Sequence, residues 1–376
     1  MKSLCLHIVS FDIPFPANYG GVIDVFYKIK ALHSAEARIH LHCYEYQRKP
    51  APELAAYCES VHYYPRKTGL GVNFSLKPYI VASRMSEDLM KNLLRDDYPV
   101  IFEGLHTCGF IHDKRLNGRF LVYRESNIEH NYYYHLFKAE KNLLKKLFFL
   151  AESARLRLFQ KRLVHASVML TVSKEDTNYL SAAFPGKRVV YLPSFHCNAG
   201  VNILPGKGSY ALYHGKLSVP ENSTAAEFLI GKVWEDTFPL LVIAGLNPPG
   251  WLTKLAENRQ NIRFIPNPSD DEMIRLISEA HVNIMVTFQS TGLKLKLLNA
   301  LYHGRFCLVN PQMVTGTPLG ELCILASEPA ELKEQIDRLF LLNFTESLIN
   351  KRESVLAKHF SNQNNCNLLM EILTLR

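Results

Sequence analysis

The sequence lacks the paired cysteines that a disulfide framework or a zinc site requires. Its eight cysteines are scattered over 376 residues, and no two of them form a CxxC pair. Most lie within apolar runs, where a thiol packs as a small hydrophobic side chain. The pattern therefore predicts reduced cysteines in the core of a cytoplasmic protein, with neither a disulfide framework nor a zinc ion.

Long apolar runs and a targeting segment are also missing. A membrane-spanning helix needs about 18 or more consecutive apolar residues, and no stretch of that kind occurs. The first residues, MKSLCLHIVSF, are too short and too interrupted by polar residues for a signal peptide, and they continue into a strand pattern. We therefore expect a cytoplasmic protein without a transmembrane helix.

Acidic residues do not occur at the spacing of a cation site. The pairs Asp96-Asp97 and Asp270-Asp271 stand alone, and Asp271 falls in the first turn of a predicted helix, where the helix dipole favours an acid. We therefore predict no metal ion. The formal charge of +8 suits an anionic partner such as a nucleotide or a phospholipid surface. No base-reading module is visible, so we predict no nucleic acid partner.

What the sequence does contain is the composition of a globular protein with more than one core. It is 47% hydrophobic and 21% charged, without low-complexity tracts or evident repeats. A chain of this length exceeds one ordinary core, which predicts two domains. Apolar strand patterns alternate with helical patterns along the whole chain, and this alternation predicts an α/β fold.

The most informative stretch runs from Val282 to Pro311. A buried strand over 282–288 is followed by the polar loop QSTG, a helical pattern closed by Gly304, and a second apolar run over 305–310. The loop brings Gly292 and two hydroxyls to a helix N-terminus, where unpaired N–H groups and the helix dipole favour a phosphate. Lys294, in the first turn, could neutralise a second phosphate charge.

The helix after this loop has two different faces. At about 100° per residue, its leucines form one apolar stripe. Gly292, Lys296, Asn299 and His303 fall on the opposite side, which could meet a ligand. The alternative is an ordinary loop followed by a helix with a solvated edge, and the motif alone weighs these two interpretations equally.

In the first half, polar loops follow two predicted strands. After the strand over 4–10, a proline-containing loop leads to Gly20-Gly21, where the backbone could approach a ligand closely; a tight turn into the helix near Val22 is the alternative. The strand over 100–102 ends before His106. Ligands of open α/β sheets lie beyond such strand ends, so His106 could orient or deprotonate a hydroxyl. A structural role is the alternative for any of the 15 histidines.

Two further segments of the first half each allow two interpretations. The strand over 120–123 is followed by RESNIEH, in which Arg124, Asn127 and Glu129 could recognise a polyhydroxylated substrate or could surround a helix cap. The stretch from Lys141 to His165 is a long basic amphipathic helix pattern. It could lie on an anionic membrane surface, or it could be a core helix with a solvated basic face.

The second half repeats the α/β pattern after a linker. The stretch 193–208 has no periodicity and contains prolines and glycines. Strands are then predicted over 210–214, 240–244 and 262–265, and Ser269 should cap the helix that follows. We predict a first domain over 1–195, a linker over 196–208, a second domain over 209–357 and a final helix over 358–376.

Three strings of residues, taken together, carry a family resemblance: STGLKLK (290–296) with Asn299-Ala300-Leu301 and Gly304, YHGKLS (213–218) with Glu221-Asn222, and RESNIEH (124–130). The first resembles the donor-phosphate loop and following helix of the retaining nucleotide-sugar glycosyltransferases of the GT-B fold, family 4, which includes bacterial hexosyl- and mannosyltransferases. The second is similar to that family's other donor motif, and the third to an acceptor-domain segment of one branch. The resemblance implies two Rossmann-like domains that face each other across a cleft.

The resemblance also implies roles for individual residues. His106, Lys216 and Lys294 would act in catalysis, because they lie where the family places a histidine near the sugar and cations near the leaving diphosphate. The donor nucleotide-diphosphate sugar would be bound by Gly20, Gly21, Gly215, Asn222, Ile265, Asn267, Thr291, Gly292, Lys296 and Asn299. The acceptor, a glycan or a lipid-linked glycan, would be bound by Arg124, Asn127 and Glu129. Positive side chains would replace the metal that other glycosyltransferases use, and the final helix would pack on the first domain.

The sequence departs from the family at the donor site. Thr291 and Asn299 occupy the positions of two glutamates, Lys216 that of an arginine and Asn222 that of a lysine. Asn299 can still form hydrogen bonds with ribose hydroxyls. Lys216 keeps the positive charge, but it cannot make the paired hydrogen bonds of an arginine guanidinium. A metal-independent hexosyltransferase of surface polysaccharide synthesis, in the cytoplasm or at the inner membrane, is the leading hypothesis. A non-catalytic sugar-nucleotide or glycan-binding protein and a sugar-nucleotide epimerase of the same fold are the alternatives.

Overall fold

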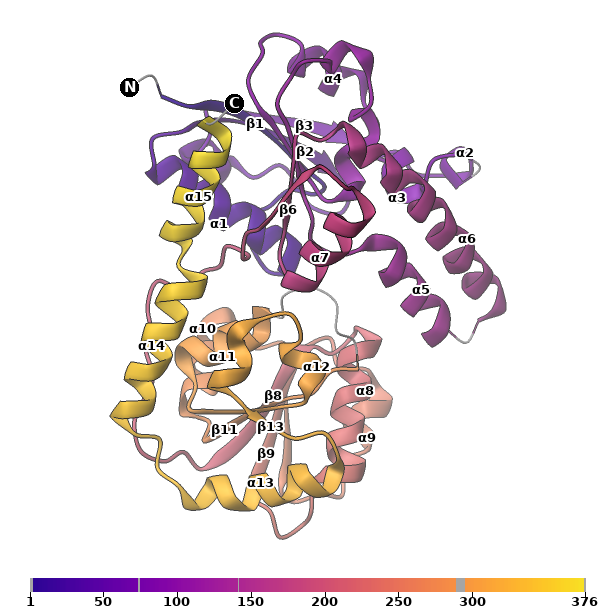
Figure 1. Ribbon diagram of the computed structural model, residues 1–376. Coiled ribbons are helices and arrows are strands. Elements are labelled where there is room, and N and C mark those ends of the chain that lie inside the picture. Colours follow the sequence, from indigo (N-terminus) through magenta and orange to yellow (C-terminus); the bar gives the residue numbers. More distant parts are fainter. Residues whose placement is uncertain (1–2, 74, 141, 289–294, 375–376) are drawn as a thin grey trace. The chain divides into compact units, whose positions relative to one another are not determined.

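The computed structural model describes residues 3–73, 75–140, 142–288 and 295–374, which form two compact units. Of the described residues, unit 1 comprises 3–197 and 360–374, and unit 2 comprises 198–288 and 295–359. Each unit is a parallel sheet covered by helices (Figure 1). Over these described ranges, the last helix of the chain therefore belongs to the same unit as its first half.

Unit 1 is built on a seven-stranded sheet in the order β3-β2-β1-β4-β5-β6-β7, with every pair parallel. Its strands are β1 (Cys5–Ser10), β2 (Arg38–Glu45), β3 (Ser60–Pro65), β4 (Val100–Glu103), β5 (Leu121–Arg124), β6 (Val168–Thr171) and β7 (Arg188–Tyr191). Four of them, β1, β4, β5 and β6, are almost entirely buried, as strands covered on both faces must be. The strand order reverses between β1 and β4, so a ligand site is expected beyond their carboxyl ends.

The helices of unit 1 connect these strands and include the end of the chain. They are α1 (Gly20–Ser34), α2 (Leu70–Asn73), α3 (Tyr79–Ala82), α4 (Glu87–Leu93), α5 (Glu129–Ala139), α6 (Leu143–Gln160), α7 (Lys174–Ala183) and α15 (Asn362–Thr374), with 3₁₀ turns η1 (Pro52–Ala56), η2 (Leu105–Phe110), η3 (Lys114–Leu116) and η4 (Lys161–His165). The final helix α15 lies against α1 (Figure 1). Leu369 and Ile372 of α15 are fully buried in the core that β1 and α1 share. The final helix is thus part of unit 1, as the resemblance implies.

Unit 2 is built on a six-stranded parallel sheet in the order β10-β9-β8-β11-β12-β13. Its strands are β8 (Tyr210–Lys216), β9 (Leu240–Leu246), β10 (Ile262–Pro266), β11 (Val282–Met285), β12 (Phe306–Val309) and β13 (Ile324–Leu325). Its helices are α8 (Pro220–Phe228), α9 (Gly250–Lys254), α10 (Asp270–Glu279), α11 (Leu295–His303), α12 (Pro311–Val314), α13 (Pro329–Leu341) and α14 (Glu346–Phe360), with the π-helical turn η5 (Leu229–Val233) and the 3₁₀ turn η6 (Pro318–Leu322). The reversal of strand order falls between β8 and β11.

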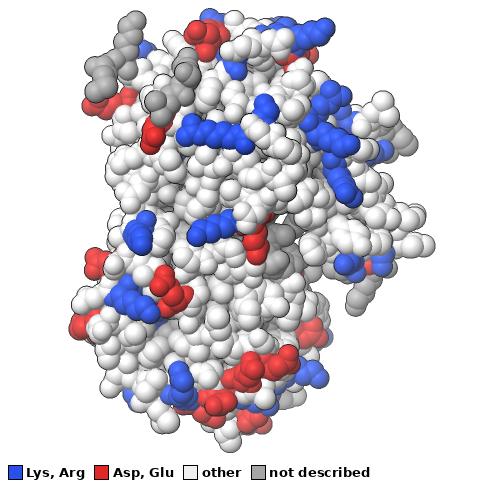
Figure 2. Space-filling view, viewed as in Figure 1, with Lys and Arg blue, Asp and Glu red and all other residues white. Residues whose placement is uncertain are grey.

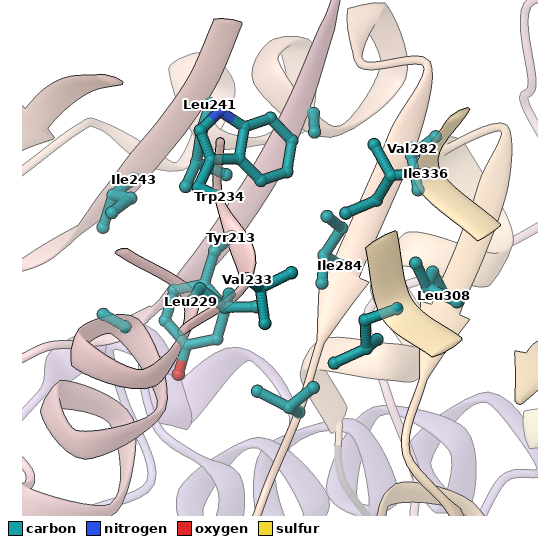
Figure 3. Packing of buried hydrophobic residues seen from close by; sticks show 14 of the residues in the cluster. Tyr213, Leu229, Val233, Trp234, Leu241, Ile243, Val282, Ile284, Leu308 and Ile336 are labelled. Atoms are coloured by element: carbon teal, nitrogen blue, oxygen red, sulfur yellow. The ribbon is translucent and has the colours of Figure 1, made fainter. Parts of the chain in front are cut away.

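The core of unit 2 lies between this sheet and the helices that cover it. Figure 3 shows Tyr213 of β8, Trp234 and Ile284 of β11 pointing into one apolar cluster. Side chains of α13 such as Ile336 close the cluster from the helix side. All the buried members of this cluster come from unit 2 itself. The core therefore supports the strand ends without help from the first half of the chain.

The predicted elements match the structure with small shifts at their ends. The strand predicted over 282–288 ends at Met285. Beyond it, the Thr287 N–H donates to the Asn310 side chain and not to a neighbouring strand. The helix predicted over 141–165 is α6 followed by a 3₁₀ turn, with Lys141 outside the described residues. Ser269 accepts a hydrogen bond from the Glu272 N–H at 3.2 Å, which confirms the predicted helix cap. In the described part of the chain, no helix combines the length and apolarity needed to cross a bilayer.

Candidate functional site

Several predicted donor-site residues lie at one end of the unit 2 sheet. Gly215 and Lys216 end β8, and Asn222 lies in the first turns of α8. Lys296 belongs to α11, the helix that follows β11 in the chain. Because β8 and β11 are neighbours at the point where the strand order reverses, these residues surround the expected ligand position.

A chain of hydrogen bonds joins these residues. The Lys296 ammonium donates to Asn222 Oδ1 at 3.0 Å, and Asn222 Nδ2 donates to the Lys216 carbonyl at 3.0 Å. The Lys296 ammonium also lies 5.3 Å from the ring centre of Tyr213, within the range of a cation–π contact. Lys296 is thus held at the carboxyl end of β8, and the exposed Lys216 is the last residue of that strand. The arrangement places the Lys296 ammonium where an anionic ligand is expected, with a second lysine at the strand end.

Two glycines allow the ends of β8 and β9 to approach each other. A Cβ added at Gly245 would lie 1.8 Å from the Gly215 carbonyl oxygen, and one added at Gly215 would lie 3.1 Å from the Asn222 side chain. Any side chain at Gly245 would therefore separate the two strands. The close approach helps to hold Asn222 beneath Lys296.

A second link crosses the reversal point and was not predicted. The Thr287 hydroxyl donates to Glu221 of α8, and the Thr287 backbone exchanges two hydrogen bonds with the side chain of Asn310. Asn310 follows β12, so its amide orders the segment that leaves β11. Neither Thr287 nor Asn310 belongs to a recognisable motif. A polar residue near the end of each of two buried strands was the only sequence signal.

The ligand-facing side of α11 is occupied in part by neighbouring side chains. Asn198 donates to Asn299 Oδ1 at 3.0 Å, and the Asn198 Oδ1 atom lies 2.9 Å from His303 Nε2. Burial lowers the pKa of His303, which keeps its imidazole neutral near pH 7. Lys296, Asn299 and His303 are half-buried, whereas the leucines of the predicted apolar stripe are buried from Leu297 onward. The predicted division of the helix into two faces is confirmed over the described residues.

The loop of Ile265 and Asn267, which the resemblance implies to bind the donor, lies at the same edge of the sheet. Ile265 is half-buried in β10, and the exposed Asn267 follows it with a φ of 52°. The Asn267 N–H donates to the Gly245 carbonyl at 2.9 Å, and its Oδ1 atom accepts from the Asn247 N–H at 2.8 Å. Asparagine tolerates this left-handed conformation better than most residues do. The two loops after β9 and β10 are therefore fixed to each other beside the strand ends.

A buried histidine lies next to this group. His214 of β8 is 5% exposed, and burial, with Lys296 nearby, lowers its pKa to about 3. Its Nε2 atom has no hydrogen-bond partner within the described ranges. His214 therefore stays neutral over the physiological range and adds no charge to the site.

In unit 1, His106 and Glu129 lie together near the carboxyl end of β4. The His106 Nδ1 atom is 3.8 Å from Glu129 Oε1, and the His106 ring packs on Phe11. Burial lowers the pKa of His106 well below its ordinary value, and Arg84 and Arg66 add to this effect. Burial also raises the pKa of Glu129 to about 8, although Arg84 opposes the shift. Near pH 7, a neutral imidazole thus stands beside a largely protonated carboxyl.

These two groups offer the chemistry that a sugar hydroxyl needs. A neutral imidazole can accept the hydroxyl proton, and a protonated carboxyl can donate a hydrogen bond to an oxygen. The strand end holds His106 close by, because Gly104 turns the chain with a φ of 69° and a Cβ there would lie 3.0 Å from His106 Nδ1. This pair is the candidate acceptor site of unit 1.

The prediction that Arg124 binds an acceptor is wrong. Its side chain is 1% exposed and binds both carboxylate oxygens of Asp24 at 3.1 Å, as well as the Leu192 carbonyl at 2.6 Å. Its nitrogens donate to Asp24 and to backbone carbonyls, which leaves no donor for a substrate. The chain position of Arg124, directly at a strand end, gave no sign of the buried acid on α1 that captures it.

Other predicted residues of unit 1 remain predictions. Asn127 is half-buried, and its N–H donates to Glu125 at 2.9 Å. Gly20 and Gly21 begin α1, and a Cβ at Gly21 would lie 2.5 Å from the Phe11 ring. Gly21 thus makes room for the Phe11 ring, which packs on His106. The glycine therefore has a structural role, and the predicted approach to a ligand would be a second one.

The remaining predicted residues lie outside the described part of the chain. Thr291, Gly292 and Lys294 are these residues, so the predicted phosphate loop stays a prediction. Among the described residues, no group of three or more histidine, cysteine, aspartate or glutamate side chains could hold a metal ion. The prediction of metal independence is left to experiment.

Comparison with known proteins identifies the fold. No family model matches the chain. Over 377 aligned residues the chain is 24% identical to an uncharacterised 44.6 kDa protein in the cps region of Klebsiella pneumoniae, covering 92% of each protein. Among solved structures it resembles sucrose-phosphate synthase of Thermosynechococcus elongatus, with a TM-score of 0.71, 13% identity and 98% of both chains covered.

Two more solved structures match over almost the whole length. HepE of Anabaena in complex with UDP and glucose has a TM-score of 0.64 at 11% identity, with 99% of both chains covered. TarM has a TM-score of 0.68 at 8% identity, also with 99% of both chains covered. These likenesses show that the chain has the GT-B fold, built from two Rossmann-like units.

Proposed function

We propose that the protein is a glycosyltransferase that moves a hexose from a nucleotide-diphosphate sugar to a glycan or lipid-linked acceptor, with retention of configuration. The observation that carries the proposal is the chain from Lys296 through Asn222 to Lys216 in unit 2. It lies where the strand order reverses, on a fold that glycosyltransferases use. Fold alone does not determine function, so the argument rests on this charged site.

The two lysines suit the main requirement of the reaction. Sugar transfer releases a nucleoside diphosphate, and positive charges held in place before the reaction stabilise this developing negative charge. Lys296 is fixed by Asn222 and Tyr213, so little reorganisation is needed when charge develops. Lys294, in the predicted phosphate loop, would add a third charge. This electrostatic role makes a metal unnecessary in the proposal.

Unit 1 would position the acceptor. In the proposal, the neutral His106 imidazole orients the attacking hydroxyl and the protonated Glu129 carboxyl hydrogen-bonds a second sugar oxygen. Burial of both groups supports this assignment, because it keeps them uncharged while they bind a neutral sugar.

The similar proteins suggest which donor and process to test first. HepE was solved with UDP and glucose, and with UDP-glucose, so UDP-sugars are the first candidates. The Klebsiella relative lies in a cps region, which supports a role in cell-surface polysaccharide synthesis. We extend both suggestions to this chain as proposals.

A non-catalytic sugar-nucleotide-binding protein is the second candidate. The observation that favours it is the replacement of two family glutamates by Thr291 and Asn299, together with the capture of the Asn299 side chain by Asn198. A ribose contact through Asn299 would have to compete with this hydrogen bond. This candidate predicts binding of a donor without transfer.

Donor binding by the full-length protein tests the proposal. Thermal shift and ligand-observed NMR would be measured with UDP-, GDP- and ADP-sugars, with and without EDTA. Lys296→Met should weaken binding about tenfold to a hundredfold, because a hydrogen bond to a charged group contributes about 1.5–3 kcal/mol. Lys232→Met, at an exposed lysine of η5 in the same unit, is the control and should bind normally.

The outcomes separate the two candidates. Metal-independent stabilisation by one donor, lost in Lys296→Met, supports the donor site, and transfer or slow hydrolysis of that donor supports an enzyme. Binding with no turnover against any acceptor tested favours the non-catalytic protein. No binding of any donor by the folded protein overturns the assignment of the site.

A further inference from the structure

The helix α6 of unit 1 presents its apolar side chains outward. Leu143, Leu144, Leu147 and Leu158 are exposed, and Leu144 is 79% exposed. On the inward side, by contrast, Glu152 is 0% exposed. In an ordinary surface helix the leucines face the core and the acids face water. In α6 several leucines face water instead, and the acid Glu152 faces the core.

Hydrogen bonds fix this orientation. One carboxylate oxygen of Glu152 accepts from the Tyr79 N–H at 2.6 Å, and the other accepts from Arg155 at 2.9 Å. Ser153 donates to the His130 carbonyl of α5 at 2.7 Å. Rotating α6 to bury its leucines would break these buried polar contacts, which is costly in a core. The outward leucines are therefore a defined feature of the helix.

The outward leucines form a continuous stripe. At about 100° per residue, positions 143, 147, 150 and 158 fall within one side of the helix. Leu150 is exposed like the others, and Ala151 and Ala154 lie between them on the same side. Exposed apolar patches of this kind mark interaction surfaces on soluble proteins. Something must cover this stripe in the working protein.

The charges around the stripe are of one sign. From 143 to 165 the chain has six lysines and arginines and a single acid, Glu152, which is buried. Lys145, Arg157, Lys161 and Arg162 are exposed. Figure 2 shows the side of the molecule that carries α6 as mostly white, with blue groups at its upper and lower ends and a red group beside the lower ones. A partner that covers the leucines must therefore be apolar and carry negative charge nearby.

This combination argues against a second copy of the chain as the partner. Two copies paired face to face through α6 would bring the basic side chains of one helix against those of the other, because a twofold interface joins identical patches. Like charges placed opposite each other oppose binding. A bilayer with anionic lipids instead offers an apolar interior for the leucines and phosphate groups for the lysines and arginines.

We propose that the outward side of α6 is a docking surface for an anionic phospholipid bilayer. The leucines insert at the boundary between headgroups and acyl chains, and the flanking basic residues bind lipid phosphates. The helix lies in the plane of the interface and does not cross it. The surface belongs to unit 1, and docking does not depend on the donor site of unit 2. It would bring unit 1 to the membrane surface.

Vesicle co-sedimentation of the full-length protein tests this proposal. Vesicles of phosphatidylcholine alone are compared with vesicles of an equal mixture of phosphatidylcholine and phosphatidylglycerol. The protein should bind the anionic vesicles and not the neutral ones, and salt should weaken binding because exposed charges are screened. The double variant Leu144→Glu, Leu147→Glu should lose at least about tenfold in affinity, since two apolar insertions are replaced by charges that anionic lipid repels.

A matched leucine serves as the control. Leu341→Glu, at a leucine of α13 in unit 2 that is 78% exposed, should bind vesicles as the wild type does. All the substituted leucines are exposed, so thermal melting should stay unchanged, and donor binding should be unaffected. Failure to bind anionic vesicles, or equal binding by the double variant, overturns the proposal. A change of molar mass by light scattering in the double variant alone would instead assign the stripe to a protein interface.

Discussion

At the residue scale, four buried charges hold unit 1 together. Lys28 of α1 contacts Glu103 of β4 at 2.7 Å and Asp24 at 3.0 Å, and Asp24 in turn binds Arg124 of β5. The Phe195 N–H also donates to Asp24, at 2.7 Å. Although burial alone would raise the pKa of Asp24, Arg124 and Lys28 hold it below its ordinary range. The two acids and two bases form a neutral set.

Removing one member should unbalance this set. Arg124→Met leaves Asp24 and Glu103 buried with a single cation, and should lower the free energy of unfolding by about 3–5 kcal/mol. Urea denaturation followed by circular dichroism measures the change. Arg38→Met breaks an exposed ion pair with Glu59 and should have a much smaller effect. Equal effects of the two variants would show that the buried network does not stabilise the fold.

A second residue-scale feature is a line of histidines across the first strands of unit 1. His7 Nδ1 lies 2.8 Å from His42 Nε2, His7 Nε2 lies 2.9 Å from Asp96, and His42 Nδ1 lies 2.8 Å from the Tyr64 hydroxyl. Burial lowers the pKa of His7 to about 4, even though Asp96 opposes the shift. The native state therefore binds a proton at His7 less readily than the unfolded state does.

This difference predicts a loss of stability in acid. Because the folded pKa lies below the unfolded value of 6.5, the unfolded state gains protons first as the pH falls, and the free energy of unfolding should decrease between about pH 6.5 and pH 4. Each unit of pKa difference corresponds to about 1.4 kcal/mol. His7→Gln, which cannot titrate, should be less stable near neutral pH but should show a flatter pH profile. If the free energy of unfolding of His7→Gln depended on pH as steeply as that of the wild type, the acid sensitivity would come from other buried histidines.

At the element scale, the close approach of β8 and β9 determines where the donor-site residues lie. Gly245→Ala places a methyl group against the Gly215 carbonyl. We expect a loss of about 1–3 kcal/mol or more, as for other overpacked cores, together with weaker donor binding. Thermal melting and ligand titration measure both effects.

A glycine in open space provides the comparison. A Cβ at Gly231 of η5 meets no atom within 4 Å. Gly231→Ala should therefore be neutral or slightly stabilising, since alanine favours helical backbone more than glycine does. If the two variants melted alike, the strand contact would not be the constraint we assign to Gly245.

At the scale of the whole molecule, the two units differ in how the chain builds them. The described core residues of unit 2 all lie between positions 198 and 359, whereas the core of unit 1 includes residues of α15 from the end of the chain. A fragment of residues 198–359 should therefore fold by itself. A fragment of residues 1–197 should not fold stably, because it lacks Leu369, Ile372 and the other α15 side chains that fill the core.

Circular dichroism and heteronuclear NMR of the two fragments test this prediction. Cooperative melting and dispersed resonances are expected for 198–359 only. Addition of α15 through a flexible linker should restore folding of the first fragment. A stable 1–197 fragment without α15 would contradict the role of the final helix.

Much of the fold could be predicted from local patterns. Period-two and continuous apolar runs indicated β1, β4, β8 and β11 within a few residues, and the stripe of α11 was correct because buried leucines recur at helical spacing. Of the site, Lys216 and Asn222 were assigned through the family resemblance, and Lys296 also lay on the predicted polar face of its helix. The structure joins these three residues by hydrogen bonds.

Other parts depended on contacts between residues far apart in the chain. Arg124 was interpreted as a substrate contact because nothing near it in sequence reveals Asp24, which lies 100 positions earlier. Thr287 and Glu221 meet only after α8 folds over the end of β11. The outward leucines of α6 were read as a possible core face, since periodicity shows that a helix has an apolar side but not which way that side points.

The sequence by itself determined the α/β class, the two units and the positions of the polar loops, because strand and helix periods and glycine turns are local properties of the chain. Only the tertiary structure decided which polar residues are buried partners, which reach a ligand and which face of α6 meets solvent. Burial and long-range pairing decide these roles. They arise when distant strands and helices pack together, as Asp24 and Arg124 do.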